Sequence, residues 1–248
     1  MTPSSGKAAP PLPMSWLPRT LEPEVMDTEE EAHDYDAMDH AAVNVRFADD
    51  VLAVLVDTRA KRGRVLDVGT GTALIPIELC ARAPEVVVDA IDLAENMLAL
   101  ARRNVERAGL AARIHLHRVD AKHTSWSGGA FEVVLSNSIV HHIPEPADAL
   151  REMWRLVAKG GVLFVRDLAR PESASRVAEL VDLYAPRAAS GDAAITARHD
   201  RQRALFEASL HAALTVPEVQ AMVAPLGIPA TAVVMTSDRH WTLASLKP

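Results

Sequence analysis

The sequence has one cysteine and no surplus of basic side chains, and each shortage argues against a class of protein. Cys80 is the only cysteine among 248 residues, so no internal disulfide can form and nothing requires an oxidising compartment. The net charge of −7 is the opposite of what a general nucleic-acid binder needs around phosphates. We therefore expect no nucleic-acid partner.

Long apolar runs are also missing. No run approaches the roughly 18 residues that a helix needs to span a bilayer, and the N-terminus lacks the apolar core of a secretory signal. We therefore predict no membrane association and a cytoplasmic location. Hydrophobic residues are abundant, at 49%, which is enough for a substantial buried core.

The first part of the chain differs in composition from the rest. Residues 1–24 contain six prolines, at positions 3, 10, 11, 13, 18 and 23, which disfavour helices and strands and predict a flexible tail. Residues 25–60 predict a helical extension, with a helix beginning near Thr28 and a second one carrying Phe47 and Val51 on one face. Residues 61–248 form the predicted main domain.

From Arg64 onward, short β-branched runs alternate with longer amphipathic ones. Strands are expected at 64–68, 86–92, 113–120, 131–137 and 160–168, with helices at 72–83, 94–108 and 146–158. Gly109 and Gly160 stand where helices would end. The alternation predicts an α/β fold with a doubly wound, mostly parallel sheet. Two more strands, at 230–236 and 240–246, bring the sheet to seven.

Residues 171–215 interrupt this rhythm with about 45 residues of largely helical pattern, too long for a simple crossover. We interpret them as a helical insertion after the fifth strand. A further helix should follow, beginning near Pro217 and ending at Gly227. Because the extension and the insertion are additions to the sheet, we expect them to form a lid over an acceptor pocket; a homodimer interface is the alternative.

The turn after the first strand contains Gly69 and Gly71. Glycines there let the backbone turn sharply and approach a ligand closely, and ligands of open α/β sheets bind outside the carboxyl ends of the strands. A dinucleotide fingerprint would need a glycine where Leu74 stands. The acidic Asp67 ahead of the turn also suits a zwitterionic amino acid better than a pyrophosphate.

Two further carboxylates stand at the next strand ends. Asp92 can accept hydrogen bonds from both hydroxyls of a ribose, and Asp120 can accept one from an adenine amine. Three successive strand ends therefore offer a glycine turn, a ribose acceptor and an adenine acceptor. Together they describe a nucleoside with an amino-acid tail.

The motifs VLDVGTGTALIPIELC, AIDLAENMLALARRN, VDA at 119–121 and FEVVLSNSIVHHIPEPADALREMWRLVAKGGVLFVRD resemble those of class I S-adenosylmethionine-dependent methyltransferases. They are most similar to small-molecule enzymes of the ubiquinone/menaquinone-biosynthesis group. The resemblance implies that S-adenosylmethionine contacts Gly69, Gly71, Asp92, Leu93, Met97, Asp120, Ala121 and Asn137. One departure is Ala73, which replaces the third glycine usual in the first motif.

The chemistry of methyl transfer needs an aligned acceptor, and a base only when that acceptor must lose a proton. His141 and His142 follow the fourth strand and are the candidate bases, although such a pair can also simply pack the helix start. The Asn/Asp-Pro-Pro-aromatic motif of enzymes that methylate bases is missing here. No ligand spacing supports a metal site, so none is predicted.

Candidates for contacting a small-molecule acceptor are Tyr35, His40, Arg166 and Arg239. Our leading hypothesis is an enzyme that moves a methyl group from S-adenosylmethionine to a small molecule by in-line displacement. The alternatives are a non-catalytic S-adenosylmethionine-binding module and a nicotinamide-dependent oxidoreductase.

Overall fold

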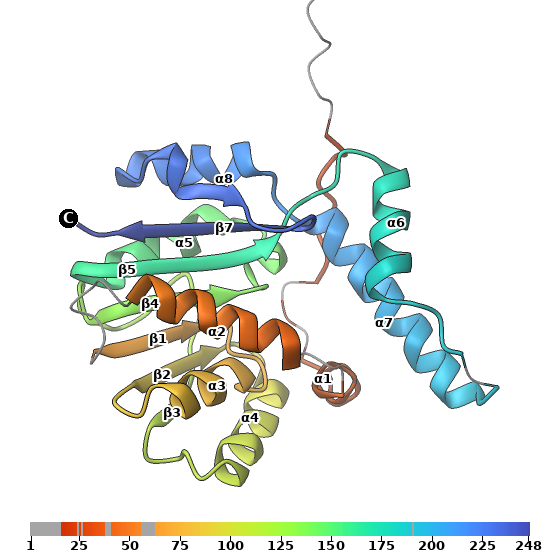
Figure 1. Ribbon diagram of the computed structural model, residues 1–248, viewed down its shortest axis with the longest axis horizontal. Helices are drawn as coiled ribbons and strands as arrows, with labels where there is room; N and C mark the ends of the chain where they lie inside the picture. Colours follow the sequence, from red (N-terminus) through yellow and green to blue (C-terminus); the bar gives the residue numbers. More distant parts are fainter. Residues whose placement is uncertain (1–15, 24, 26, 38–40, 56–62, 190) are drawn as a thin grey trace, which may run out of the picture.

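A seven-stranded sheet forms the centre of the protein (Figure 1). The computed structural model describes residues 16–23, 25, 27–37, 41–55, 63–189 and 191–248. The strands are β1 (Arg64–Val68), β2 (Val87–Asp92), β3 (Ile114–Arg118), β4 (Phe131–Asn137), β5 (Val157–Leu168), β6 (Val233–Met235) and β7 (His240–Leu246). Their order across the sheet is β3-β2-β1-β4-β5-β7-β6. Only β7 runs antiparallel to its neighbours, which confirms the predicted fold class.

Helices cover both faces of this sheet. They are α1 (Glu29–Asp36), α2 (Ala41–Leu55), α3 (Leu74–Arg82), α4 (Glu95–Arg107), α5 (Pro146–Leu156), α6 (Ala174–Tyr184), α7 (Ala193–Ala212) and α8 (Val216–Val223), with 3-10 turns η2 (Val140–His142), η3 (Ala224–Leu226) and η4 (Ala230–Ala232). None of the helices in these described ranges is long and apolar enough to cross a membrane.

Two hydrophobic cores hold the layers together, because successive side chains of a strand point to opposite faces. On one face, Phe47 of α2 and Leu79 of α3 pack against Phe164 of β5. On the other, Leu150 of α5 and Val219 of α8 pack against further strand residues. Figure 1 shows α2 crossing in front of the strands.

Gly109 and Gly160 differ in their roles. Gly109 follows the end of α4 with φ +69°, as expected for a residue that terminates a helix. Gly160 is not a helix cap, contrary to our prediction: α5 ends at Leu156 and β5 has already begun at Val157. Gly160 lies within β5 at φ +76°, beside an irregularity in the pairing of β4 with β5.

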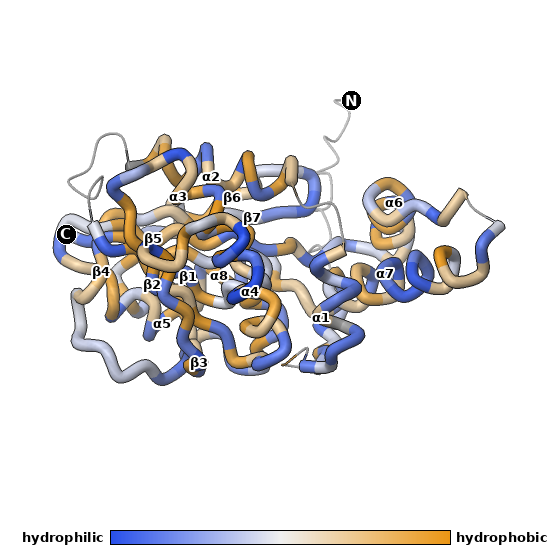
Figure 2. The backbone as a smooth tube through the Cα atoms, turned by 90° about the horizontal axis from the view of Figure 1, so that it is seen from below, coloured by the Kyte–Doolittle hydropathy of each residue, from blue (hydrophilic) through white to orange (hydrophobic). Residues whose placement is uncertain are grey.

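The carboxyl ends of the parallel strands point toward α1, α6 and α7, on the right of Figure 1. Helices α6 and α7 occupy the predicted insertion and have a core of their own, in which Val177, Leu180 and Val181 pack with Leu210. Figure 2 shows α1 as hydrophilic along most of its length, whereas hydrophobic stretches gather in the sheet. The strand ends are therefore flanked by the two segments that are additional to the sheet.

The N-terminal segment, residues 16–23, has no helix or strand but is attached to the domain. The Arg19 guanidinium donates hydrogen bonds to the carbonyls of His141, Ile143 and Ala212 at 2.7–3.0 Å. The backbone N–H of Thr20 donates to the carbonyl of His211 at 3.0 Å. The flexible tail predicted up to residue 24 thus gives way to an anchored segment at residue 16; residues 1–15 lie outside the described ranges.

Candidate functional site

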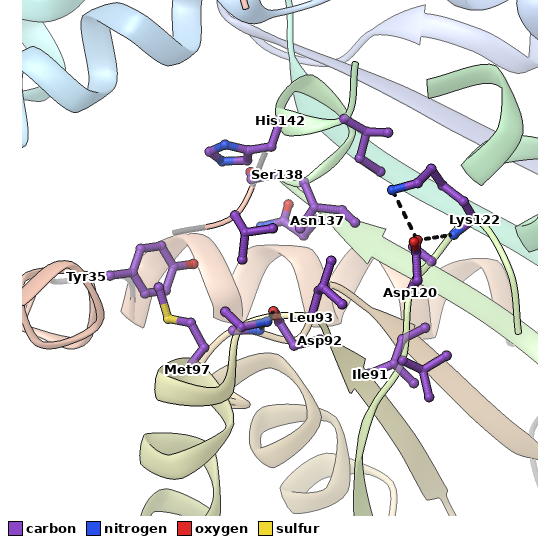
Figure 3. A pocket seen from close by; sticks show the side chains of 18 residues that line it. Tyr35, Ile91, Asp92, Leu93, Met97, Asp120, Lys122, Asn137, Ser138 and His142 are labelled. Carbon is purple, nitrogen blue, oxygen red and sulfur yellow. Dashed lines mark hydrogen bonds and ion pairs between the residues drawn. The ribbon is translucent and has the colours of Figure 1, made fainter. Parts of the chain in front are cut away.

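A pocket lies at the carboxyl ends of β1 to β4 (Figure 3). It encloses about 820 Å³ of empty space, counting the part open to solvent. Its walls consist of the residues that follow each of these strands, together with two residues from the N-terminal extension. The lining residues are Val25, Tyr35, Gly69, Gly71, Ile91, Asp92, Leu93, Ala94, Met97, Val119, Asp120, Ala121, Lys122, Asn137, Ser138, Ile139, His142 and Ile143.

All eight residues predicted to contact the cofactor line this one pocket. They are Gly69, Gly71, Asp92, Leu93, Met97, Asp120, Ala121 and Asn137. The structure brings them together from four strand ends, because parallel strands place their carboxyl ends at a common edge. Their contacts with a cofactor remain a prediction.

Both the backbone conformation of the turn after β1 and the packing around it favour glycine. Gly69 and Gly71 have φ +73° and +53°, a region that side chains disfavour. A Cβ on Gly69 would lie 2.1 Å from Cγ2 of Ile139. Ala73, where the motif usually has a third glycine, also has a left-handed φ of +63°. The departure at Ala73 therefore costs about 1 kcal/mol of backbone strain without changing the path of the turn.

Asp92 ties the end of β2 to the glycine turn. Its Oδ2 accepts a hydrogen bond from the backbone N–H of Gly71 at 2.8 Å, and its Oδ1 accepts one from that of Ala94 at 2.9 Å. Burial raises the pKa of Asp92, and the two backbone hydrogen bonds oppose that rise. The side chain is thus held in one position at the pocket wall.

Asp120 is held in a different way. The Lys122 backbone N–H donates to its Oδ1 at 2.9 Å, and the Lys122 ammonium lies 3.2 Å from the same atom. Burial alone would raise the pKa of Asp120, but the contacts with Lys122 outweigh it and the pKa is lowered. Asp120 therefore stays charged at neutral pH, beside Lys122, which is the only Lys or Arg among the described residues that line the pocket.

Asp67 lies behind the glycine turn and does not line the pocket. It is 2% exposed, and its Oδ2 has no hydrogen-bond partner among the described residues. Burial raises its pKa to about 7, against a lowering by the Thr70 side chain. The acidic residue that the sequence places ahead of the turn is therefore a buried carboxyl, half-protonated near neutral pH.

The two candidate bases have different environments. His142 lines the pocket, whereas His141 does not. Burial, together with the charge of the neighbouring His141, lowers the pKa of His142 to about 3, so His142 is neutral at pH 7. His142 is therefore a weak base at the pocket wall.

His141 is buried behind the pocket and faces Asp167. Its Nδ1 lies 2.5 Å from Oδ1 of Asp167, which also accepts the backbone N–H of Leu168 at 2.6 Å. Burial lowers the pKa of His141, but the charge and hydrogen bond of Asp167 outweigh it and the pKa is raised. His141 therefore lies behind His142 and is not among the residues that line the pocket.

Tyr35 brings α1 to the pocket. Burial raises the pKa of its hydroxyl to about 12, with Asp92 and Asp67 adding to the rise, so the hydroxyl stays protonated. Helix α1 is fixed on α4 by Asn104, whose Nδ2 donates to Asp36 at 3.0 Å. Just before α1, Asp27 accepts from the backbone N–H of Asn96 at 2.9 Å. Of the predicted acceptor residues, Tyr35 is the one at the pocket.

Arg166 and Arg239 are not among the residues that line this pocket. Arg166 shares a face of β5 with Phe164, donates to Asp50 of α2 at 2.7 Å and to Thr242 of β7 at 3.0 Å. The guanidinium of Arg239 lies 3.3 Å from the ring centre of Tyr184, on α6. His40 lies outside the described residues.

Other lining residues were not predicted from the sequence. Lys122 and Ala94 each stand two positions after a strand-end aspartate, and both backbone N–H groups donate to that aspartate. This turn, repeated after each aspartate, is a local sequence pattern from which Ala94 and Lys122 could have been predicted. Val25 had no such signal, since nothing in the sequence indicates which part of the extension reaches the pocket. No residue of α6 or α7 lines it.

Comparison with known proteins agrees with this geometry. A family model described as a methyltransferase domain matches residues 65–161, from β1 into β5. This part of the chain is therefore similar to a methyltransferase domain. The fold extends further: a putative S-adenosyl-L-methionine-dependent methyltransferase from Methanococcus maripaludis superimposes with a TM-score of 0.64, covering 92% of this chain and 96% of that one at 18% identity.

Curated relatives match a little under half of the chain. Phosphatidylethanolamine N-methyltransferase of Cereibacter sphaeroides is 38% identical over 112 residues, which is 45% of this chain and 54% of that protein. Demethylmenaquinone methyltransferase of Thermus thermophilus is 36% identical over 108 residues, covering 44% of this chain and 48% of that protein. The chain thus matches about half the length of these relatives.

Proposed function

We propose that this protein transfers a methyl group from S-adenosylmethionine to a small-molecule acceptor in the pocket at the strand ends. The observation that carries the proposal is that Gly69, Asp92 and Asp120, from three successive strand ends, line one pocket. A nucleoside with an amino-acid tail needs a close backbone approach, a ribose acceptor and an adenine acceptor, and these residues supply them in that order.

The residues present fit this cofactor. Gly71 has a φ of +53°, and a Cβ there would be in van der Waals contact with the Tyr35 ring at 3.5 Å, so glycine keeps this part of the pocket wall open. Backbone N–H groups fill part of the roughly four acceptor positions of the Asp92 carboxylate, which leaves room for ribose hydroxyls. Leu93, Met97 and Val119 supply an apolar wall for an adenine ring.

S-adenosylmethionine supplies an electrophilic methyl group on sulfur. The protein's contribution is to hold the acceptor in line with that methyl group and to exclude water. Asn137 and Ser138, at the end of β4, and His142 beside them form the wall where an acceptor would enter. The neutral His142 suits hydrogen bonding to an acceptor hydroxyl or amine better than it suits removal of a proton.

The names of the relatives support small-molecule acceptors. One is a phosphatidylethanolamine methyltransferase and the other a demethylmenaquinone methyltransferase. The apolar part of the pocket wall, which includes Ile139 and Ile143, is compatible with an acceptor that has an apolar portion. We propose this class of acceptor without choosing the accepting atom.

The pocket is poorly suited to a nicotinamide dinucleotide. Lys122 is the only Lys or Arg side chain among the lining residues, and its ammonium pairs with Asp120. A pyrophosphate would lie near Asp92 without a basic partner of its own. This disfavours the oxidoreductase alternative.

Turnover is the direct test of transfer. The full chain would be incubated with S-adenosylmethionine carrying an isotope-labelled methyl group and with small-molecule fractions of a cell extract. We expect S-adenosylhomocysteine to form and one compound to gain the label. Tight S-adenosylmethionine binding without S-adenosylhomocysteine formation in any fraction would favour a non-catalytic binding module.

A further inference from the structure

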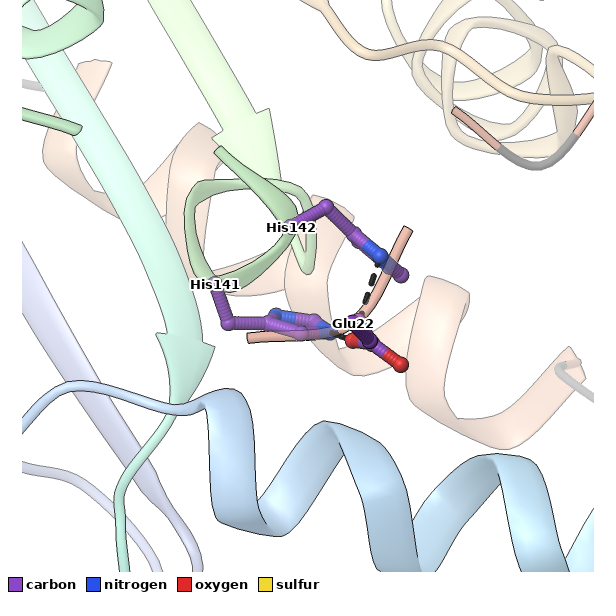
Figure 4. A group of neighbouring side chains, drawn as sticks. All are labelled: Glu22, His141 and His142. Atoms are coloured by element: carbon purple, nitrogen blue, oxygen red, sulfur yellow. Dashed lines mark ion pairs between the residues drawn. The ribbon is translucent and has the colours of Figure 1, made fainter. Parts of the chain in front are cut away.

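Three side chains behind the pocket converge on one point (Figure 4). Oε1 of Glu22, in the N-terminal segment, lies 3.5 Å from Nε2 of His141 and 3.2 Å from Nδ1 of His142. The three atoms lie within 4.8 Å of one another. The side chains are 8%, 3% and 17% exposed respectively, so the group is largely shielded from solvent.

One nitrogen in this group has no hydrogen bond. Nδ1 of His142 is buried and has no hydrogen-bond partner in the described part of the chain, although the Glu22 carboxylate is close. A buried polar atom that is unpaired is destabilising and needs an explanation. Two ring nitrogens and a carboxylate oxygen within 4.8 Å of one another are a combination that could hold a cation.

The outer contacts also fit a metal site. Asp167 lies 2.5 Å from Nδ1 of His141, so the Nδ1–H can be donated to it while Nε2 faces Glu22. Metal-bound histidines commonly donate their second ring N–H to a carboxylate, which fixes the ring and its tautomer. Ser209 of α7 donates to Glu22 at 3.2 Å and so orients the third side chain.

Two of the three separations between the ligand atoms match a tetrahedral ion, and the third is below 4.8 Å. Ligand atoms at 2.0–2.1 Å from such an ion lie about 3.3 Å apart, and the two separations from Glu22 are 3.2 and 3.5 Å. Two imidazoles and one carboxylate suit a divalent transition metal, whereas Mg²⁺ and Ca²⁺ prefer oxygen ligands. A site with three protein ligands keeps a fourth position for water or another ligand.

We propose that Glu22, His141 and His142 bind a divalent transition-metal ion of the Zn²⁺ type, with Asp167 positioning His141. Such an ion would join the N-terminal segment to η2 at the pocket wall, because His142 also lines the pocket. The sequence alone predicted no metal, since Glu22 is distant in the chain from the histidine pair. The site does not depend on the proposed methyl transfer, and its test needs no substrate.

The test is a metal titration of the full chain, without an affinity tag and after treatment with a chelator. Zn²⁺ would be titrated in competition with a chromophoric chelator, and Co²⁺ would be added separately to record its visible absorption. We expect one equivalent to bind and Co²⁺ to show the intense bands of four-coordinate geometry. Binding of less than one equivalent, or Co²⁺ bands of octahedral geometry only, would overturn the proposal.

Variants locate the site. Glu22→Gln and His142→Asn should each lower Zn²⁺ affinity by at least about 100-fold, and Asp167→Asn by about 10- to 100-fold. The matched control is His115→Asn, which changes an exposed histidine on β3 and should leave the affinity unchanged. Circular dichroism would verify that each variant is folded. Equal affinity in Glu22→Gln and the unmodified chain would place the ion elsewhere and refute the site.

Discussion

Oδ2 of Asp92 accepts a hydrogen bond from the backbone N–H of Gly71 at 2.8 Å. This hydrogen bond joins the residue assigned to the ribose to the turn assigned to the methionine part of the cofactor. A change at Asp92 would alter both the ribose contact and the position of the turn. Asp92→Asn, which keeps the size of the side chain, is consequently a better probe than Asp92→Ala.

Gly69→Ala should destabilise the protein more than Gly109→Ala. Both glycines have positive φ, so each substitution carries about 1–2 kcal/mol of backbone strain. Only at Gly69 would the new Cβ also collide, at 2.1 Å, with Ile139, whereas nothing lies within 4 Å at Gly109. Urea unfolding of both variants measures the difference. Equal losses in the free energy of unfolding would show that Ile139 moves away without cost.

Stability should fall as the pH rises from about 4 to about 7, through Asp67. Its pKa is raised from 3.8 in the unfolded chain to about 7 in the folded protein. Over that interval the folded state binds more protons than the unfolded state, so rising pH favours unfolding by up to about 4 kcal/mol.

Asp67→Asn removes this titration and should flatten the dependence of unfolding free energy on pH. Urea titrations at pH 5 and pH 8 would compare the variant with the unmodified protein. Between pH 5 and pH 8, the free energy of unfolding of the variant should rise relative to that of the unmodified protein. If that difference is the same at both pH values, Asp67 does not titrate in the folded state as described.

His141→Ala should destabilise the fold far more than His142→Ala. Removing His141 leaves the buried Asp167 carboxylate without its imidazole partner, a loss of about 3–5 kcal/mol. His142 makes no hydrogen bond through Nδ1, so its loss should cost about 1 kcal/mol. Thermal unfolding of the metal-free variants checks the order. The reverse order would mean that His142, not His141, is the structural member of the pair.

Cofactor binding should protect α1 more than α6 and α7. Tyr35 of α1 lines the pocket, whereas no residue of α6 or α7 does. The sequence predicted a lid made of the N-terminal extension and the helical insertion. For the cofactor, we now expect only the extension to act as a lid. Hydrogen exchange at fixed protein concentration, with and without S-adenosylhomocysteine, should show slower exchange in residues 29–36. Slower exchange in residues 174–184 and 193–212 alone would point to a different closure.

The sequence predicts the sheet and the pocket well because both depend on local patterns. Strand 131–137 has the predicted bounds, and Asp92 ends its strand as expected, since alternating runs and glycine turns are encoded within a few residues. Gly160 was misassigned because a left-handed glycine suits both a helix end and an irregular strand.

Contacts between distant segments could not be predicted in this way. Arg166 stands at a strand end like Asp92, but its side chain lies on the face covered by α2, where Asp50 pairs with it. Glu22 meets His142 only because the N-terminal segment is anchored along η2 by Arg19. Neither partner is indicated by spacing along the chain, so long-range packing decides both.

The central claim, that this pocket binds S-adenosylmethionine, is tested most directly by calorimetric titration of S-adenosylhomocysteine into the full chain and into Asp92→Asn, with NADH as the comparison ligand. We predict one site for S-adenosylhomocysteine, weakened by about 10- to 100-fold in the variant because a charge-assisted hydrogen bond is lost. NADH should not bind. Unchanged affinity in Asp92→Asn, or binding of NADH in place of S-adenosylhomocysteine, would contradict the account.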